Sequence, residues 1–167
     1  MTPAGGQRTP GEWPIRVTAL FIRAGRLLVI RRERDGRRFW TFIGGNGEEG
    51  ESPAEALLRE VREETGWDLR QQPAPIELFT TRLMDGREAI FYQCECGEGE
   101  PVLGGPELQV QSEQNHYTFE WISSGELNTL VQQDLVYPRP GQGLGKILRS
   151  MRDEQLADEE DQGLDQR

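Results

Sequence analysis

Short runs of apolar residues, separated by turn-forming residues, organise most of this chain. Runs rich in β-branched and aromatic side chains predict strands at residues 15–22, 27–31, 39–42, 76–82, 89–96 and 116–122. Ala24-Gly25 and Asp85-Gly86 stand between neighbouring runs and predict tight turns. Glycine and proline predict loops at residues 44–47 and 97–106.

A helical pattern replaces the strand pattern after Ser52. Ser52 is followed by Pro53 and Glu55, which is the order of an N-cap, a first-turn proline and a capping-box glutamate. Gly66 offers the left-handed conformation that closes many helices. The pattern therefore predicts a helix over Pro53–Thr65, and weaker signals predict further helices at residues 124–131 and 144–156.

The length of the chain fits a single domain, which we expect over residues 15–156. Residues 1–14 are rich in glycine and proline, and residues 157–167 are acidic and polar. Both segments have little apolar surface to bury, so we expect a flexible N-terminal tail and a disordered acidic C-terminal tail.

The net charge of the chain limits which molecules it is expected to bind. The chain has 167 residues and a formal net charge of −10, from 29 acidic and 19 basic residues. Such a field repels polyanions, so neither a nucleic acid polymer nor an anionic membrane is expected as a partner. No apolar run approaches membrane-spanning length. A small anionic substrate would need local help from cations or a metal, and a cytoplasmic protein is expected.

Two cysteines, Cys94 and Cys96, alternate on a predicted strand, where the side chains diverge from disulfide geometry. A zinc site would need both thiolates, the single histidine His116 and a carboxylate. Two buried, reduced cysteines are the favoured interpretation.

The predicted helix carries two different faces, because each residue turns by about 100°. One arc is apolar and is expected to face the core: Ala54, Leu57, Leu58 and Val61. Another arc is acidic, since residues three and four apart are neighbours on a helix: Glu60, Glu63 and Glu64.

Three converging carboxylates repel one another unless a cation is bound. Mg²⁺ prefers carboxylate oxygens and retains room for water and phosphate, so this acidic arc is well suited to it. A solvated acidic face relieved by Arg59 and Arg62 is the alternative on the cluster alone.

The residues around the cluster favour the metal site. Gly45, Glu51, the run from Arg59 through Glu60, Val61, Arg62 and Glu63 to Glu64, and Gly66-Trp67 stand in the order and spacing of the Nudix box. The chain thus resembles the Nudix hydrolases, in particular bacterial pyrophosphohydrolases of nucleoside diphosphate derivatives. Two positions depart from the usual pattern without removing a ligand: Ile43 replaces a common proline, and Trp67 replaces an aliphatic residue.

The resemblance implies an α/β/α sandwich with a mixed sheet and a loop–helix–loop that holds Mg²⁺, with Mn²⁺ as a substitute. It implies metal ligation by Glu60, Glu64 and the Gly45 carbonyl, with Glu63 as a further ligand or base and Arg59 paired with Glu51. The metal would polarise a diphosphate while a carboxylate accepts a proton from the attacking water.

Residues outside the box are less constrained by the resemblance. Family members often recruit another acidic residue from a late loop, for which Glu113 is the first candidate, Glu120 the second, and Glu107 remains open. A basic turn could bring guanidinium groups to substrate phosphates, although a solvated hairpin is the simpler interpretation: Arg31, Arg37 and Arg38.

The expected activity is hydrolysis of a diphosphate linkage in a nucleoside triphosphate, nucleotide sugar or dinucleotide. A catalytically silent nucleotide-sensing module is the main alternative, because one fold can host several functions. An mRNA-decapping enzyme is less compatible with the acidic composition. The sequence leaves open whether the protein forms a homodimer.

Overall fold

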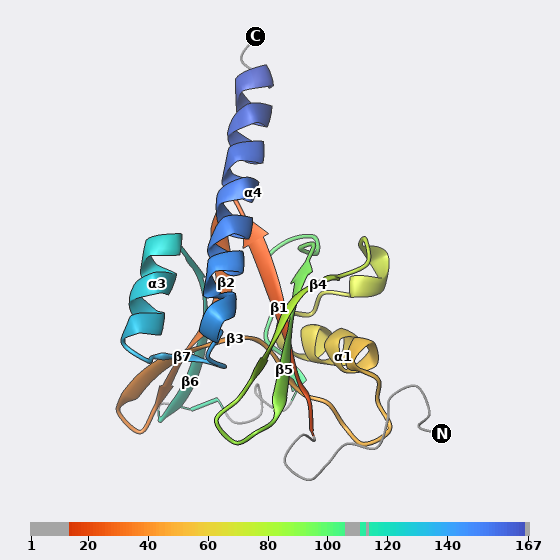
Figure 1. The fold of residues 1–167 in the computed structure, drawn as a ribbon, viewed down its shortest axis with the longest axis vertical. Coiled ribbons are helices and arrows are strands. Elements are labelled where there is room, and N and C mark those ends of the chain that lie inside the picture. The colour runs from red at the N-terminus through yellow and green to blue at the C-terminus, as the bar shows by residue number, and fades with distance from the viewer. Residues whose placement is uncertain (1–13, 106–110, 113, 166–167) are drawn as a thin grey trace.

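A computed structural model describes residues 14–105, 111–112 and 114–165 (Figure 1). Its strands are β1 Arg16–Arg23, β2 Arg26–Arg34, β3 Arg37–Asn46, β4 Ile76–Arg82, β5 Glu88–Cys94, β6 Asn115–Ile122 and β7 Val136–Tyr137. Its α-helices are α1 Pro53–Thr65, α3 Ser124–Gln132 and α4 Leu144–Asp165, and the 3₁₀ turns are η1 Leu69–Gln71 and η2 Gly141–Gly143.

The strands form one mixed, curled sheet in the order β4-β5-β1-β2-β3-β7, with β6 pairing with β2. The pairs β1–β5 and β3–β7 are parallel, and the others are antiparallel. Strand β3 pairs with β2 through its first half and with β1 through its second half. This crossing curls the sheet and brings the end of β3 beside the start of β1.

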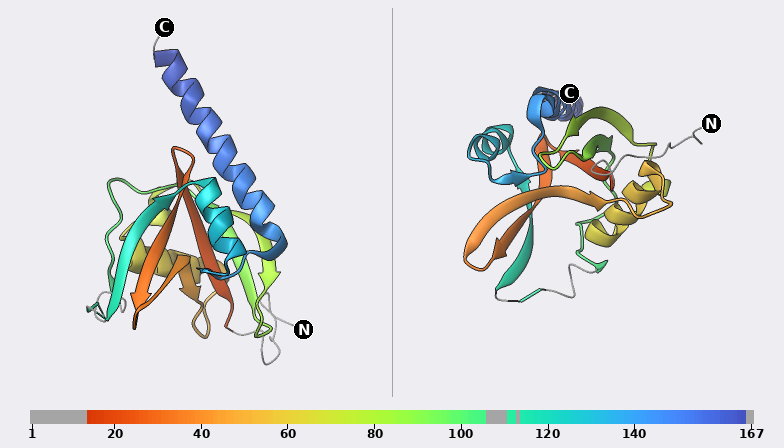
Figure 2. Two further views of the ribbon diagram at one scale, coloured as in Figure 1. Left: turned by 90° about the vertical axis from the view of Figure 1, so that its left-hand side faces the viewer. Right: turned by 60° about the horizontal axis from the view of Figure 1, so that its bottom comes forward.

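Helices cover both faces of the sheet, as Figure 2 shows. Helix α1 packs on one face through Ala56, Leu57 and Val61. Helices α3 and α4 pack on the other face, where their buried residues are Leu127, Leu130, Ile147 and Met151. The observed architecture confirms the predicted α/β/α layering with a mixed sheet.

The glycine-rich stretch after Ile43 does not form the predicted loop. Gly44 and Gly45 belong to β3 and pair with Thr18 and Val17 of β1. A Cβ atom on Gly44 would lie 2.0 Å from the Val17 carbonyl oxygen, and the φ of Gly44 is +146°. Glycine here allows two strands to approach closely, and the prediction mistook this close packing for a turn.

The C-terminal helix also differs from expectation. Helix α4 continues to Asp165, although the sequence predicted disorder from residue 157. Glutamate, glutamine, leucine and alanine are good helix formers, and Gln155 Nε2 donates to Glu159 Oε1 one turn later, at 3.4 Å. Local propensity therefore extends the helix beyond its last buried contacts. The predicted N-terminal tail lies almost wholly outside the described residues, and the domain limits stay a prediction.

None of the helices in the described part of the chain combines the length and hydropathy needed to span a bilayer.

Both cysteines are free thiols, Cys94 buried and Cys96 partly buried. Burial, followed by the neighbouring Cys96, raises the pKa of Cys94 to about 12. Only the thiolate reacts readily with alkylating agents, so native Cys94 should react with iodoacetamide at pH 8 at least about a hundred-fold more slowly than in urea. Peptide mass spectrometry measures both rates, and equal rates would contradict the burial of this thiol.

Candidate active site

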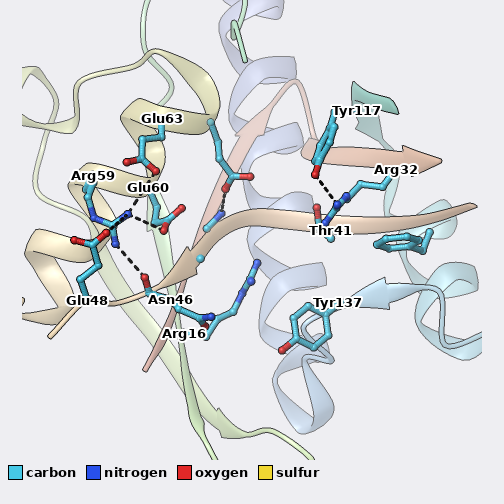
Figure 3. Close-up of a pocket in the computed structure, with 14 residues that line it drawn as sticks. Arg16, Arg32, Thr41, Asn46, Glu48, Arg59, Glu60, Glu63, Tyr117 and Tyr137 are labelled. Carbon is cyan, nitrogen blue, oxygen red and sulfur yellow. Dashed lines mark hydrogen bonds and ion pairs between the residues drawn. The ribbon is translucent and has the colours of Figure 1, made fainter. Parts of the chain in front are cut away.

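A cavity of about 470 Å³ opens where β3 crosses from β2 to β1 (Figure 3). One wall is acidic and comes from α1 and the segment before it: Glu48, Glu60, Glu63 and Glu64. The other wall is basic and aromatic: Arg16, Arg32, Phe39, Tyr117 and Tyr137. The cavity therefore joins a cation-attracting wall to an anion-attracting wall.

Local sequence signals position the helix that carries the acidic wall. Helix α1 begins after Ser52, whose Oγ accepts from the Glu55 N–H at 3.1 Å, while Glu55 Oε1 accepts from the Ser52 N–H at 3.1 Å. It ends at Gly66, which has φ of +77°. The predicted bounds Pro53–Thr65 and both caps are confirmed.

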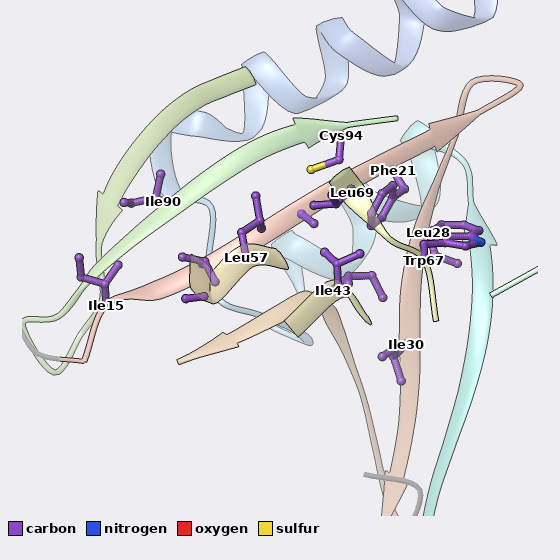
Figure 4. Close-up of a cluster of buried hydrophobic side chains, with 14 residues drawn as sticks. Ile15, Phe21, Leu28, Ile30, Ile43, Leu57, Trp67, Leu69, Ile90 and Cys94 are labelled. Carbon is purple, nitrogen blue, oxygen red and sulfur yellow. The ribbon is translucent and has the colours of Figure 1, made fainter. Parts of the chain in front are cut away.

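Apolar packing sets the rotation of α1. Figure 4 shows Leu57 directed into the cluster that also contains Ile43 and Leu69. Ala56 and Val61 are buried beside Leu57, and Leu58 is partly buried. Ala54 is exposed, so its predicted place in the core was wrong, because the first turn of α1 presents Ala56 to the sheet instead.

With this rotation, the carboxylates point toward the cavity at different depths. Glu60 and Glu64 are only 7% and 5% exposed, whereas Glu63 is partly exposed. The Gly44 N–H donates to Glu64 Oε1 at 2.6 Å, which links the helix to β3. Glu64 is thereby held in one orientation by a charge-assisted hydrogen bond.

Gly45 makes room for the second buried carboxylate. A Cβ atom at this position would lie 2.4 Å from the Glu60 Cδ atom and 2.5 Å from both carboxylate oxygens. Any larger residue at position 45 would therefore displace Glu60. Because Gly45 has no side chain, the Glu60 carboxylate of α1 can lie directly against β3.

Arg59 connects the acidic groups to one another. Its Nε and Nη2 atoms donate to the two carboxylate oxygens of Glu51 at 2.8 and 2.9 Å, which is the expected ion pair. Its Nη1 atom lies 2.9 Å from Glu60 Oε1 and 3.4 Å from Glu63 Oε2. The bidentate bond raises the pKa of Arg59 and lowers the pKa of Glu51.

The pair predicts how stability depends on pH. Because the pKa of Glu51 is lowered on folding, its stabilising effect is present above about pH 4.3, the ordinary glutamate value, and is lost as pH falls through the folded pKa. Melting temperatures of wild type and Glu51→Gln should differ at neutral pH and converge in acid. A difference that grows in acid would contradict this assignment.

The basic wall uses arginines other than those predicted. Side chains alternate along β2, so Arg32 faces the cavity beside α1 while Arg31 faces the opposite side of the sheet. The Arg32 guanidinium lies 4.3 Å from the centre of the Tyr117 ring and 5.2 Å from that of Phe39. The cavity lining does not include the arginines proposed from sequence, namely Arg31, Arg37 and Arg38, and their part in binding stays a prediction.

The remaining acidic candidates do not extend the acidic wall in the described structure. Glu120 accepts from Trp40 Nε1 at 2.8 Å and lies 3.9 Å from Arg31 Nη1, on the sheet face turned away from α1. Glu113 and Glu107 lie outside the described residues.

The donors of the acidic wall fit a hard divalent cation. In the part of the chain that the structure describes, no three His, Cys, Asp or Glu side chains are grouped as a preformed metal cage. Mg²⁺ usually binds through one or two carboxylates and completes its shell with water and substrate phosphates, so a complete protein cage is not required. Two buried carboxylates with a third at the rim meet that requirement.

Comparison with known proteins finds similarity in both sequence and fold. The NUDIX domain pattern matches residues 13–139. The chain is 30% identical over 121 residues to an octanoyltransferase of Myxococcus xanthus, spanning 70% of this chain and 33% of that protein. It is 54% identical over 33 residues to an 8-oxo-dGTP diphosphatase of Proteus vulgaris, spanning 20% of this chain and 30% of that protein. The chain thus covers about a third of the length of these two relatives.

Solved structures agree at the level of fold. A structure from a study of MutT from Aliivibrio salmonicida and Vibrio cholerae has a TM-score of 0.58 at 16% identity, covering 82% of this chain and 97% of that one. The MutT NUDIX hydrolase from Burkholderia pseudomallei has a TM-score of 0.53 at 24% identity, covering 67% and 84%. Taken with the matched domain pattern, these findings establish that the chain belongs to the Nudix hydrolase family.

Proposed function

We propose that this protein is a Mg²⁺-dependent pyrophosphohydrolase that cleaves the diphosphate linkage of a small nucleotide-like substrate by attack of water at phosphorus. The observation that carries the proposal is the convergence of Glu60, Glu63 and Glu64 on one cavity whose opposite wall carries arginines. Mn²⁺ is expected to replace Mg²⁺, because both accept oxygen donors in octahedral geometry.

Each residue of the acidic wall has a distinct part in this proposal. Glu60, Glu64 and the Gly45 carbonyl would hold the cation, which when bound polarises the phosphoryl oxygens and neutralises developing charge. Glu63 is less buried than its neighbours, so it can act as a further ligand or accept a proton from the attacking water. Arg59 orients Glu60 and Glu63 through direct ion pairs.

The substrate is proposed as a class. Nucleoside triphosphates, nucleotide sugars and dinucleotides all present a diphosphate and a planar base to a cavity with both charged and aromatic walls. The short similarity to an 8-oxo-dGTP diphosphatase is a reason to include oxidised deoxynucleoside triphosphates among the substrates tested.

The test is incubation of the wild-type protein with these three substrate classes and Mg²⁺, with products identified by mass. We expect one class to yield a nucleoside monophosphate and a second phosphorylated product or pyrophosphate. The second candidate function, a nucleotide-sensing module, predicts nucleotide binding without turnover of any substrate. The retained Nudix-box carboxylates favour the enzyme, since a sensor does not require them.

Glu113 is proposed as an additional acidic residue of the site on the strength of the family resemblance. Glu113→Gln tests this with steady-state rates. A fall of at least about ten-fold in kcat would support a role in proton transfer, which typically contributes a hundred-fold or more. A rate within a few-fold of wild type would reject it.

A further inference from the structure

The reaction proposed above assigns no part to the two arginines of the basic wall, Arg16 and Arg32. Arg16 is the first residue of β1 and lines the cavity beside Tyr137 (Figure 3). Its guanidinium carbon lies 5.2 Å from the centre of the Tyr137 ring. The guanidinium therefore stacks over an aromatic ring at the cavity wall.

The hydrogen bonding of Arg16 is incomplete. Its Nε atom is buried and has no hydrogen-bond partner within the described part of the chain. A buried donor without an acceptor is costly, and a charged donor is more so. Arg59, on the opposite wall, differs in this respect, because its donors are bound to Glu51, Glu60 and Asn46.

Burial disfavours the Arg16 cation, and the carboxylates of the facing wall offset this only in part. Burial is the main cause that lowers the pKa of Arg16; Glu64, Tyr137 and Glu60 raise it, and Arg87 has the smallest effect and lowers it. Arg87 is held in place by Asp85 at 2.7 Å, by Asn46 Oδ1 at 2.7 Å and by the Tyr137 hydroxyl at 3.1 Å. Tyr137 thus lies between two guanidinium groups, and it positions Arg16 without accepting a hydrogen bond from Arg16 Nε.

We propose that Arg16 and Tyr137 form a phosphate subsite, in which the Arg16 guanidinium donates to oxygens of a substrate phosphoryl group that the acidic wall does not hold. This inference rests on the proposed function and narrows its substrate class to compounds with phosphate oxygens on both sides of the cavity. Guanidinium forks match phosphate oxygens geometrically, and the partly covered site strengthens such bonds.

The test compares Arg16→Met and Arg16→Lys with the control Arg152→Met, which removes the same charge from an exposed position on α4. Calorimetric titration with inorganic pyrophosphate and Mg²⁺ measures binding, and thermal melting without ligand measures stability. Arg16→Met should weaken binding by about ten-fold or more, the loss expected for charged hydrogen bonds. Arg16→Lys should retain part of the affinity, and the control should bind as wild type does.

Stability separates a binding role from a structural one. Replacing a buried, unsatisfied charge with an apolar side chain of similar length should leave the melting temperature unchanged or raise it. Unchanged pyrophosphate affinity in Arg16→Met, or a melting temperature that falls well below that of the control, would overturn the inference. No binding of pyrophosphate by wild type would also overturn it. Binding through Arg16 without turnover of any substrate would reject only the proposed function.

Discussion

Glu64→Gln is expected to abolish turnover while leaving the protein folded. The substitution removes a negative oxygen ligand at nearly constant shape, so kcat should fall by at least about a hundred-fold, as expected when a catalytic metal loses a ligand. The amide oxygen of glutamine can still accept the Gly44 N–H that Glu64 Oε1 accepts at 2.6 Å. The link between α1 and β3 is therefore preserved.

Stability and a matched control make this result interpretable. Glu64 is 5% exposed and its charge favours the buried Arg16 cation, so the melting temperature of Glu64→Gln should fall while the unfolding transition stays cooperative. Glu49→Gln removes one carboxylate from an exposed position before α1 and should leave the rate unchanged. Steady-state rates with Mg²⁺ check both variants. Wild-type activity in Glu64→Gln would reject this residue as a ligand.

Gly45→Ala is expected to have the next largest effect, although it adds only a methyl group. The new Cβ atom would lie 2.4 Å from Glu60 Cδ, so either the carboxylate or the strand must move. A misplacement of about 1 Å in a reacting group can cost about a hundred-fold in rate. The atoms in the way are the end of the Glu60 side chain at the cavity wall, so the loss should appear mainly in the rate.

Gly145→Ala provides the control for this substitution. Gly145 lies on α4 with no atom within 4 Å of an added Cβ, so alanine should raise helix stability by up to about 1 kcal/mol and leave the rate unchanged. Chemical denaturation and steady-state kinetics measure the two effects. If Gly45→Ala retained both the rate and the stability of wild type, the close approach of β3 to Glu60 would be contradicted.

The parts of the site that depend on neighbouring residues could be predicted from the sequence. The capping box at Ser52 and the left-handed Gly66 determine both ends of α1, and helical periodicity then places the three glutamates on one side. These signals act within a few residues of one another. The observed α1 agrees with this prediction, except that Ala56 rather than Ala54 faces the sheet.

The basic wall could not be predicted in the same way, because it depends on strand pairing. Arg16 and Tyr137 meet because β1 and β7 both flank β3, a relation between residues more than a hundred positions apart. For Arg32 a usable signal existed. Leu28, Ile30 and Arg32 are every second residue of β2 and therefore share one face, whereas Arg31 lies on the other face. Strand parity therefore selects which arginine of a basic run enters a cavity.

The most direct test of the central claim is hydrolysis in water enriched with heavy oxygen. Wild type with Mg²⁺ and its preferred nucleotide should release two phosphorylated products, one of which carries a single heavy oxygen, and Glu64→Gln should release both at least about a hundred-fold more slowly. Cleavage by Glu64→Gln at the wild-type rate, or products without heavy oxygen, would contradict diphosphate hydrolysis by water at the acidic wall.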